Sequence, residues 1–442
     1  MKRTKRMVKR LFWGILPLLV LALASPAPGL AQSGTWTTKA PMPSVSAGPR
    51  GAVVAGTFYV VRPYVPHIGQ DQAFYAYNPQ TDQWTLKTNN PQCRHAFAIG
   101  VVDGIIYTAG GWDGGSMYDT VEAYNPITDS WQTKAPMPTA RRDLAGAVAG
   151  GIFYAIGGNI AYASPYIRSE IEAYNPSTDT WTTGLAPMPT ARNGLGAGVI
   201  NGKIYAVGGD NGSDQYYAKL EVYDPAPNNW TTKASMPTAR ACPAVEVLNG
   251  KLYVIGGYNL VDGNATALNT VEVYDPETDS WTTLTPMPTA RSNDASGAVN
   301  GVIYVAGGYD FLGNIFDTLE AFTPPITEIT VSIDIKPGSY VNSINPKSQG
   351  KIPVAILSTP DFYAPDEADL SSLTFGRTGD EASLAFCTIE DVNGDGVADV
   401  VGHFYTQATG FQKGDTQGIL KGKTTEGISF SGSDAVRIVP GK

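Results

Sequence analysis

The residues best suited to chemistry lie near the end of the chain, in the segment EDVNGDGVAD. Asp391, Asn393, Asp395 and Asp399 supply side-chain oxygens at the first, third, fifth and ninth positions of a loop, and Val397 offers its carbonyl at the seventh. Oxygen donors at alternate positions can wrap one hard cation, and calcium is the cation that prefers such a set. The spacing therefore predicts a calcium site, with a solvated Asp/Asn turn as the alternative.

A second set of reactive side chains recurs about every 50 residues. Each member is an arginine in a similar sequence context: Arg94, Arg141, Arg192, Arg240 and Arg291. Arg50 is a possible sixth member, shifted by four residues, and His95 and Arg142 follow two of the five directly. A ring of guanidiniums suits an anionic ligand. The alternative is structural, because a repeated Arg can equally hydrogen-bond the backbone between repeats.

The elements that must position these arginines are internal repeats. The repeats align on six tryptophans separated by 47 to 51 residues: Trp36, Trp84, Trp131, Trp181, Trp230 and Trp281. In most repeats the Trp is followed by a sequence such as WTTKASMPTAR, an apolar run, a short turn, a second run carrying Tyr, a Gly pair and a third run such as VEVYDP. Each unit therefore predicts four short strands, the content of one propeller blade.

This combination of paired glycines, Tyr and Trp at fixed spacing resembles the Kelch repeat family over about residues 35–323. The resemblance implies an all-β fold with a six-bladed β-propeller at residues 32–323. The sixth repeat ends at Pro325 without a Trp, whereas a fourth strand with Trp36 stands alone at the other end. We therefore expect the N-terminal strand to close the ring by completing the last blade, since an open propeller would expose sheet edges.

Alternate loops of a four-stranded meander lie on one face, and one face of this propeller is expected to carry the longer loops. These loops hold aromatic residues, of which we select five as ligand contacts: Trp112, Tyr166, Tyr217, Tyr258 and Tyr309. Loops on a rigid scaffold are where binding usually resides. In the Kelch family this face commonly binds partner proteins. The sequence thus favours a non-enzymatic protein that binds a protein or carbohydrate ligand carrying an anionic group.

The alternative function is a secreted sugar isomerase resembling the Kelch-type sialic acid mutarotases. Glu246, unusual on an inner strand, could then act as general acid and base beside Arg240. We favour the simpler interpretation, in which Glu246 is a strand residue that faces outward.

The ends of the chain predict export and a second domain. Residues 1–31 have a basic head, a short apolar core and small residues, which is typical of a secretory signal peptide. They hold six of the 31 Lys and Arg and none of the 40 Asp and Glu, so the remainder has a formal net charge of −15. Such acidity argues against nucleic acid as a partner. We expect a secreted or surface-associated monomer, of bacterial type, without membrane insertion after signal removal.

The repeats stop at a linker, residues 324–329, and the composition then changes. Residues 330–442 resemble a β-rich accessory domain at the C-termini of exported bacterial proteins, and segments such as KIPVAIL predict strands of a small β-sandwich-like domain. The calcium loop lies in this domain. It resembles an EF-hand loop, but position 12 is Gly402 instead of Glu and strands flank it.

Overall fold

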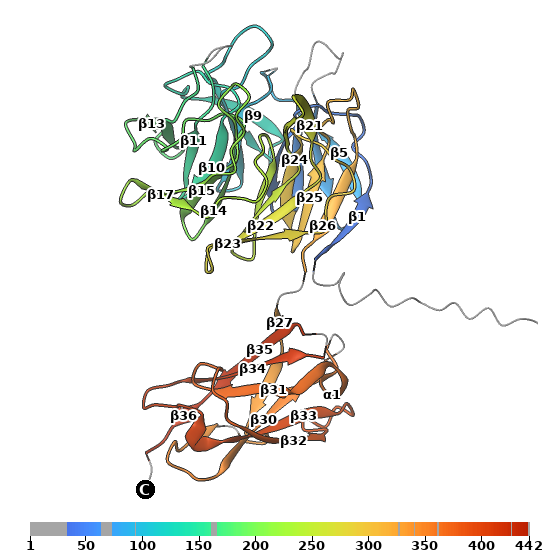
Figure 1. Cartoon of the computed structure of the whole chain (residues 1–442), viewed down its shortest axis with the longest axis vertical. Helices are drawn as coiled ribbons and strands as arrows, with labels where there is room; N and C mark the ends of the chain where they lie inside the picture. The colour runs from blue at the N-terminus through green and yellow to red at the C-terminus, as the bar shows by residue number, and fades with distance from the viewer. Residues whose placement is uncertain are drawn as a thin grey trace, which may run out of the picture.

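The computed structural model describes residues 33–62, 73–92, 94–160, 166–325, 328–339, 341–359, 362–425 and 427–440. The predicted signal peptide lies outside these ranges. Figure 1 shows two separate all-β bodies, the repeats and the C-terminal domain. No helix in the described ranges has both the length and the apolar character needed to cross a membrane.

The repeats form six four-stranded antiparallel sheets, each one blade of a β-propeller. Five of them are built from consecutive repeat segments: β2(Arg50–Val54), β3(Thr57–Arg62), β4(Ala73–Asn78) and β5(Gln83–Lys87); β6(Ala98–Val102), β7(Ile105–Ala109), β8(Val121–Asn125) and β9(Ser130–Lys134); β10(Ala145–Ala149), β11(Ile152–Ile156), β12(Ile171–Asn175) and β13(Thr180–Thr182); β14(Gly196–Ile200), β15(Lys203–Val207), β16(Leu220–Asp224) and β17(Asn229–Lys233); β18(Ala244–Leu248), β19(Lys251–Ile255), β22(Val271–Asp275) and β23(Ser280–Leu284). The predicted strand content of each repeat is confirmed.

The sixth sheet combines the two ends of the repeat region. It contains β24(Ala295–Val299), β25(Val302–Ala306) and β26(Leu319–Thr323), and β1(Thr35–Lys39) is its outermost strand. β1 runs antiparallel to β26, with Trp36 opposite Phe322. Trp36 also donates its indole N–H to the carbonyl of Thr285, at 3.0 Å, as the other repeat tryptophans do to the preceding blade. The N-terminal strand therefore has the same surroundings as the fourth strand of any other blade.

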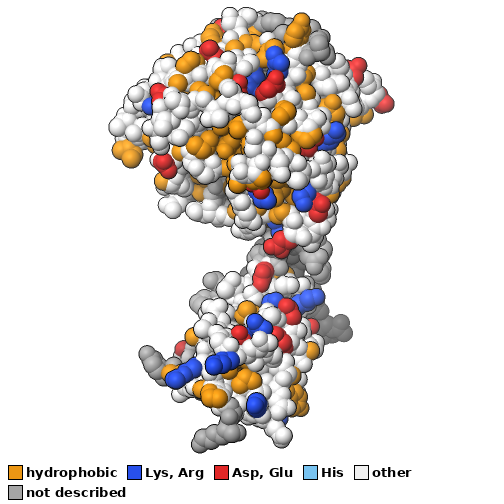
Figure 2. All heavy atoms as spheres, turned by 90° about the vertical axis from the view of Figure 1, so that its left-hand side faces the viewer, with side chains coloured by type: hydrophobic (Ala, Val, Ile, Leu, Met, Phe, Trp, Pro, Cys, Tyr) orange, Lys and Arg blue, Asp and Glu red, His pale blue; other side chains and the backbone are white. Residues whose placement is uncertain are grey.

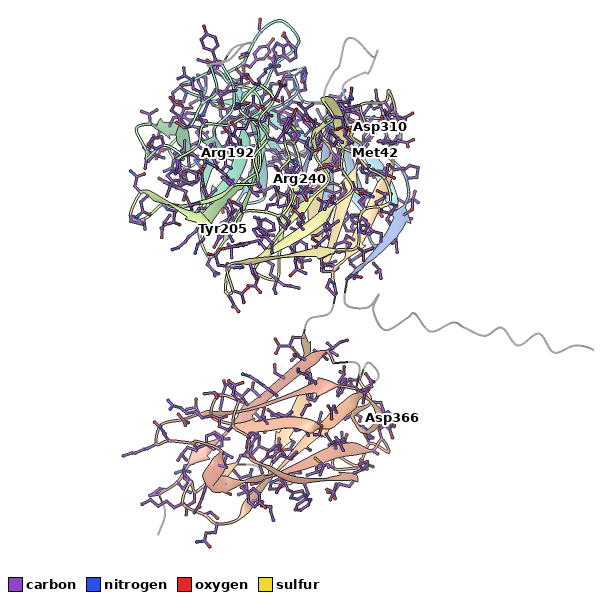
Figure 3. The ribbon with its side chains drawn as sticks, in the orientation of Figure 1. Met42, Arg192, Tyr205, Arg240, Asp310 and Asp366 are labelled. Carbon is purple, nitrogen blue, oxygen red and sulfur yellow. The ribbon has the colours of Figure 1, made fainter. Side chains whose placement is uncertain are left out.

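Neighbouring blades are held together by aromatic packing. The repeated Tyr of each second strand is buried, and Tyr205 can be located in Figure 3. Its ring centroid lies 6.1 Å from that of Tyr274 in the next blade, and Tyr274 in turn lies 5.2 Å from Trp281. Large aromatic rings supply the apolar area that keeps adjacent sheets together. These rings therefore form the core between adjacent blades.

The Gly pairs allow close packing where the second strand ends. Gly157 has a φ of +62°, and a Cβ there would lie 2.6 Å from the carbonyl oxygen of Arg192. Only glycine tolerates both the backbone conformation and this contact. The pairs are thus structural, and they bring each second strand against the Arg-containing segment of the next repeat.

The loop between the second and third strands of the fifth blade has structure of its own. It forms a two-stranded ribbon of β20(Tyr258–Val261) and β21(Asn264–Ala267). This ribbon, which the sequence did not predict, starts at Tyr258 and extends the long-loop face of the propeller.

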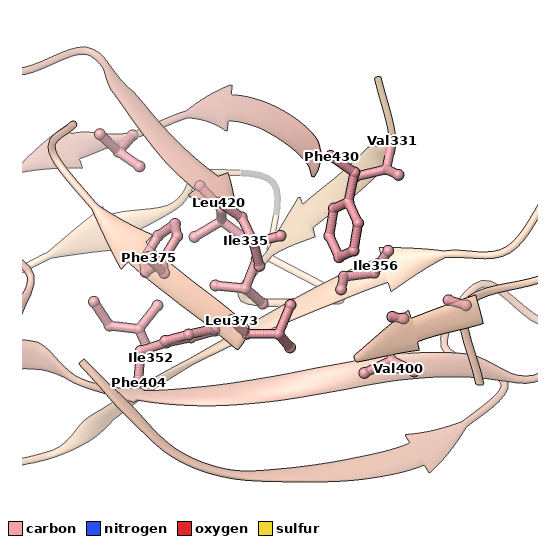
Figure 4. Close-up of a cluster of buried hydrophobic side chains, with 14 of the residues drawn as sticks. Val331, Ile335, Ile352, Ile356, Leu373, Phe375, Val400, Phe404, Leu420 and Phe430 are labelled. Carbon is pink, nitrogen blue, oxygen red and sulfur yellow. The ribbon is translucent and has the colours of Figure 1, made fainter. Parts of the chain in front are cut away.

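The C-terminal domain has two four-stranded sheets. One contains β27(Glu328–Thr330), β35(Ser429–Ala435), β34(Gln417–Thr424) and β31(Ala368–Gly376); the other contains β28(Ser332–Ile335), β30(Lys351–Leu357), β33(Asp399–Tyr405) and β32(Leu384–Glu390). Short elements complete it: β29(Ser343–Ile344), β36(Arg437–Ile438), α1(Ala364–Glu367) and a 3-10 turn at Thr406–Ala408. Side chains from both sheets, including Phe375, Phe404 and Phe430, form one apolar core (Figure 4).

Candidate functional site

The five repeated arginines are inside the blades, which corrects their prediction as ligand contacts. Arg141, Arg192, Arg240 and Arg291 have no exposed surface, and Arg94 is 2% exposed. Figure 3 places Arg192 and Arg240 among the strands of the propeller. A guanidinium without exposed surface cannot touch a ligand in the loops. The structural alternative therefore accounts for this set.

Each buried arginine pairs with a glutamate on the third strand of its own blade. The N–O distances are 3.1 Å for Arg94–Glu122, 2.7 Å for Arg141–Glu172, 3.0 Å for Arg192–Glu221, 2.6 Å for Arg240–Glu272 and 2.8 Å for Arg291–Glu320. Burial lowers the pKa of Arg192 to about 10, and the guanidinium still remains charged at neutral pH. Arg192 also donates to the carbonyls of Gly208 and Ala206. The arginine thus ties the segment that precedes β14 to β15 and β16.

The described part of the first blade has no such pair, and both of its partners are missing together. Ser46 holds the backbone position that arginines hold elsewhere, since its carbonyl accepts from Gly308 N as that of Arg141 accepts from Gly111 N. Tyr75 stands on β4 where the other blades have Glu. Arg62, at the end of β3, is buried instead and donates to the carbonyl of Val45 at 2.7 Å. The simultaneous loss of Arg and Glu supports a structural role for the pair.

Open space for a ligand lies at the centre of the long-loop face. A cavity of about 540 Å³ there is lined by Arg50, His95, Arg142, Asp143 and Tyr309, together with Phe311 and other residues of the neighbouring loops. This volume is within the range of small-molecule sites. Of the predicted contacts, the structure brings His95, Arg142 and Tyr309 to this cavity.

The other predicted aromatic contacts differ in their relation to the cavity. Trp112 stacks beneath the Arg142 guanidinium, 4.6 Å from the ring centroid, and lies 4.9 Å from the His95 ring. Tyr258 packs against Phe311, with 4.7 Å between the ring centroids. Tyr166 is 46% exposed and Tyr217 contacts Lys219, and neither lines the cavity. Trp112 and Tyr258 therefore support cavity walls, whereas Tyr166 and Tyr217 are removed from the site.

Arg50, the shifted sixth arginine, and Phe311 also line the cavity, although neither was among the selected ligand contacts. The Arg50 guanidinium forms no ion pair with any described residue and donates one hydrogen bond, to the carbonyl of Pro49 at 3.1 Å. Phe311 has a φ of +64°, which is unusual for a bulky residue, and its ring lies 4.8 Å from that of Tyr309. Such strain is often found at functional sites. The four-residue shift of Arg50 was the sequence signal that set it apart from the buried arginines.

Five residues whose backbone adopts the left-handed conformation form a collar around a channel that lies below the cavity. Each lies two positions after a repeated arginine: Ala96, Asp143, Gly194, Cys242 and Asn293, all with φ between 49° and 56°. The N–H of each later member donates to the carbonyl of the one before it, at 2.6 to 3.2 Å. The backbone of the collar is thus constant, whereas its side chains vary. This contrast with the invariant arginines could have located the site from the sequence.

Below the collar, a channel cavity of about 380 Å³ is lined by the inner strands of several blades. Glu246 lines it, so the interpretation that this residue faces outward is wrong. Its carboxylate accepts a hydrogen bond from the Ser296 hydroxyl at 2.6 Å, and burial raises its pKa to about 7. Its predicted neighbour Arg240 is engaged inside the blade with Glu272.

The structure gives the predicted calcium loop no support. The Asp391 carboxylate accepts from the N–H groups of Gly394 and Gly396, and Asp395 accepts from that of Val397. Asp399 is fully buried and accepts from the N–H groups of Ser358 and Val392. No group of three or more His, Cys, Asp or Glu side chains is placed to hold a metal ion anywhere in the described ranges. The predicted ligand Asn393 likewise bonds within the loop.

Comparisons with known proteins identify the repeats. The Kelch motif matches residues 93–138, 140–184, 191–237, 239–288 and 290–325, half of the chain. Kelch-like protein terF of Aspergillus terreus is 28% identical over 207 residues, which are 42% of this chain and 45% of terF. Kelch-like protein 36 of Bos taurus is 30% identical over 28% of this chain and 20% of that protein. The match thus spans less than half of either relative.

A solved structure shows the same fold. The structure of YjhT superimposes with a TM-score of 0.55 and 18% identity, covering 63% of this chain and 95% of that chain. At this identity the likeness concerns the arrangement of strands alone.

Proposed function

Because this chain belongs to the Kelch-repeat β-propeller family, we propose that it is a non-enzymatic binding protein. In this proposal it recognises a protein or carbohydrate ligand on the long-loop face of the propeller. The observation that carries the proposal is the cavity of about 540 Å³ at the centre of that face. Concave sites that combine aromatic walls with a few polar groups are typical of ligand binding.

Because the repeated arginines are buried, we assign the binding of the ligand's anionic group to Arg50 and Arg142 instead. Arg50 has no ion-pair partner among the described residues, whereas Arg142 lies 3.4 Å from Asp143 and stacks on Trp112. A guanidinium fork held in place at a cavity wall can bind a carboxylate through two hydrogen bonds. Tyr309 and Phe311 would pack against an apolar face of the ligand. On the side of the molecule seen in Figure 2, several Lys or Arg side chains lie next to Asp or Glu side chains, so positive and negative charge are interspersed there.

A carbohydrate and peptide array, followed by variants, tests this proposal. We expect Arg50→Gln and Phe311→Ala each to weaken binding of the array ligand by about 1–3 kcal/mol. The control is Ile127→Ala, because Ile127 is 94% exposed in the turn after β8, on the short-turn face. Unchanged affinity in both cavity variants would refute the location of the site.

A sugar isomerase remains the second candidate, because Glu246 faces the channel. A carboxyl whose pKa is about 7 suits a general acid and base near neutral pH. Turnover of sugars, followed by NMR for the wild type and Glu246→Gln, distinguishes this function from binding. Retention of a ligand without any exchange of its isomers excludes it.

Four further proposals rest on the sequence patterns. We propose that β1 closes the propeller ring, that residues 1–31 direct export to the outside or surface of a bacterial cell, and that the protein is monomeric. We also propose that the loop at 391–399 binds calcium, for which the spacing of its oxygens is the support.

A further inference from the structure

The edge strands of the two four-stranded sheets in the C-terminal domain differ in how they are protected. An edge strand exposes N–H and C=O groups, and folded proteins usually blunt it with short length, charged residues or bulges. β27 has three residues, and β28 has four, among them Asp334. The pairing of β31 with β34 is interrupted by a register shift between Asp369 and Thr374. Three of the four edges are therefore blunted.

The fourth edge, β32, lacks such protection over most of its length. Its one register shift lies between Leu384 and Phe386, so the strand is regular from Phe386 to Glu390. This part contains one charged residue, Glu390, and no Pro. β33 pairs with one side of β32, and no strand in the described part of the chain pairs with the other side. The free side can therefore pair with a further strand.

Apolar side chains on both faces of β32 are incompletely covered. Successive side chains of a strand point to opposite faces. Cys387 packs against the apolar core, whereas Ile389, on the same face, is not part of that core and is 57% exposed. On the other face, Phe386 is 46% exposed and stacks on His403, with 4.3 Å between the ring centroids. A strand added beside β32 would place its own side chains next to Ile389 on one face and Phe386 on the other.

The charge along this edge favours a cationic partner. Glu390, Asp391 and Asp395 are exposed, and residues 384–395 include no Lys or Arg. The Glu390 carboxylate accepts a hydrogen bond from the Thr388 hydroxyl at 3.1 Å and forms no ion pair within the described ranges. Opposite charges placed across two strands stabilise their pairing, and like charges destabilise it. A Lys or Arg opposite Glu390 would therefore strengthen the binding of an added strand.

We propose that β32 is a docking edge for an extended segment of a partner protein, which adds a strand to the sheet and carries Lys or Arg beside Glu390. In this binding mode, backbone hydrogen bonds supply affinity and alternate side chains supply specificity. A second copy of the chain is a poorer occupant. The regular part of β32, Phe386 to Glu390, gives a contact about 17 Å long and one sheet thick, far smaller than the roughly 800 Å² per partner of a stable dimer. The inference goes beyond the proposed function, because it concerns the other domain.

An NMR titration of the full chain with the peptide Lys-Val-Thr-Val-Phe, acetylated and amidated at its ends, tests the docking edge. Antiparallel to β32, this probe sets its Lys opposite Glu390, its first Val opposite Ile389 and its Phe opposite Phe386. We expect the backbone amide signals of β32 to shift. Only alternate residues of an antiparallel strand direct their N–H groups toward the neighbouring strand. Of two probes, one N-methylated at both Val residues and the other at Lys, Thr and Phe, one should therefore lose binding and the other keep it.

Variants of the chain test the side chains. Ile389→Gln and Glu390→Gln should each weaken probe binding about 2–5-fold, and Glu390→Gln should also reduce its salt dependence. Glu328→Gln is the matched control, because it removes an exposed carboxyl from another edge strand, β27, and should leave the affinity unchanged. Unshifted β32 signals with the unmodified probe, or equal binding of the two N-methylated probes, would overturn the proposal. So would sedimentation that shows a dimer of the full chain which Ile389→Gln dissociates, since the edge would then belong to a second copy.

Discussion

Replacing Arg192 with Met tests whether the repeated arginines stabilise the blades. Met retains much of the apolar length of the side chain but removes the guanidinium. Glu221 would keep its hydrogen bond from Thr190, at 2.7 Å, but lose its buried cation at 3.0 Å. The carbonyls of Gly208 and Ala206, which Arg192 contacts at 3.0 Å each, would lose a donor.

The expected loss of stability follows from the charge left behind. Removing one partner of a buried ion pair typically costs about 3–5 kcal/mol, because the other charge remains in a medium that solvates it poorly. Arg192→Met should therefore lower the free energy of unfolding by about that amount. The double variant Arg192→Met with Glu221→Leu should lose less than the single variant, since no unpaired charge remains.

Urea unfolding followed by tryptophan fluorescence, alongside binding of the array ligand, measures both effects. Lys203→Met is the control in the same blade, because the Lys203–Asp224 pair, at 2.8 Å, lies on the surface, and its loss should leave the unfolding midpoint unchanged. We expect Arg192→Met to bind the ligand with wild-type affinity under conditions where it remains folded. Wild-type stability combined with lost binding would refute the structural role.

Three further predictions concern other parts of the chain. Deleting residues 33–39 should lower the unfolding temperature of the propeller in calorimetry, because the last blade loses its outer strand; an unchanged temperature contradicts closure by β1. Asp391→Ala combined with Asp395→Ala should abolish calcium uptake and affect only the C-terminal unfolding transition, and calcium uptake equal to that of the wild type removes the site. Burial raises the pKa of Glu246 from 4.5 to about 7, so the folded state holds more protons than the unfolded one and stability falls as pH rises between these values. Glu246→Gln should remove about 2–3 kcal/mol of this fall between pH 5 and pH 7.5 in urea unfolding, whereas the same pH slope in both proteins would contradict the raised pKa of Glu246.

Several structural features were predictable from the sequence because they depend on short-range order. The spacing of Trp230 and Trp281 and the turn residues between them specify four strands per repeat, and the apolar second strands bury Tyr205 and Tyr253. Such patterns can be read from the sequence because each blade is built from consecutive residues and contacts mainly its neighbours. The same reasoning assigned strands to the C-terminal domain, where β30(Lys351–Leu357) includes the predicted segment KIPVAIL.

The position of charged side chains was decided by the tertiary structure. Arg192 and Arg240 would recur at the same spacing in the sequence whether their guanidiniums pointed into the channel or into their own blades. The partner glutamates, Glu221 and Glu272, lie about 30 residues later, and they become neighbours only when the third strand joins the sheet. These ion pairs hold the repeated arginines inside the blades, so the channel is lined by side chains at positions that differ between repeats, such as Glu246. The sequence by itself determined the scaffold, because local hydrogen bonding and apolar periodicity build it, whereas the ligand-facing chemistry depends on contacts between distant strands and blades.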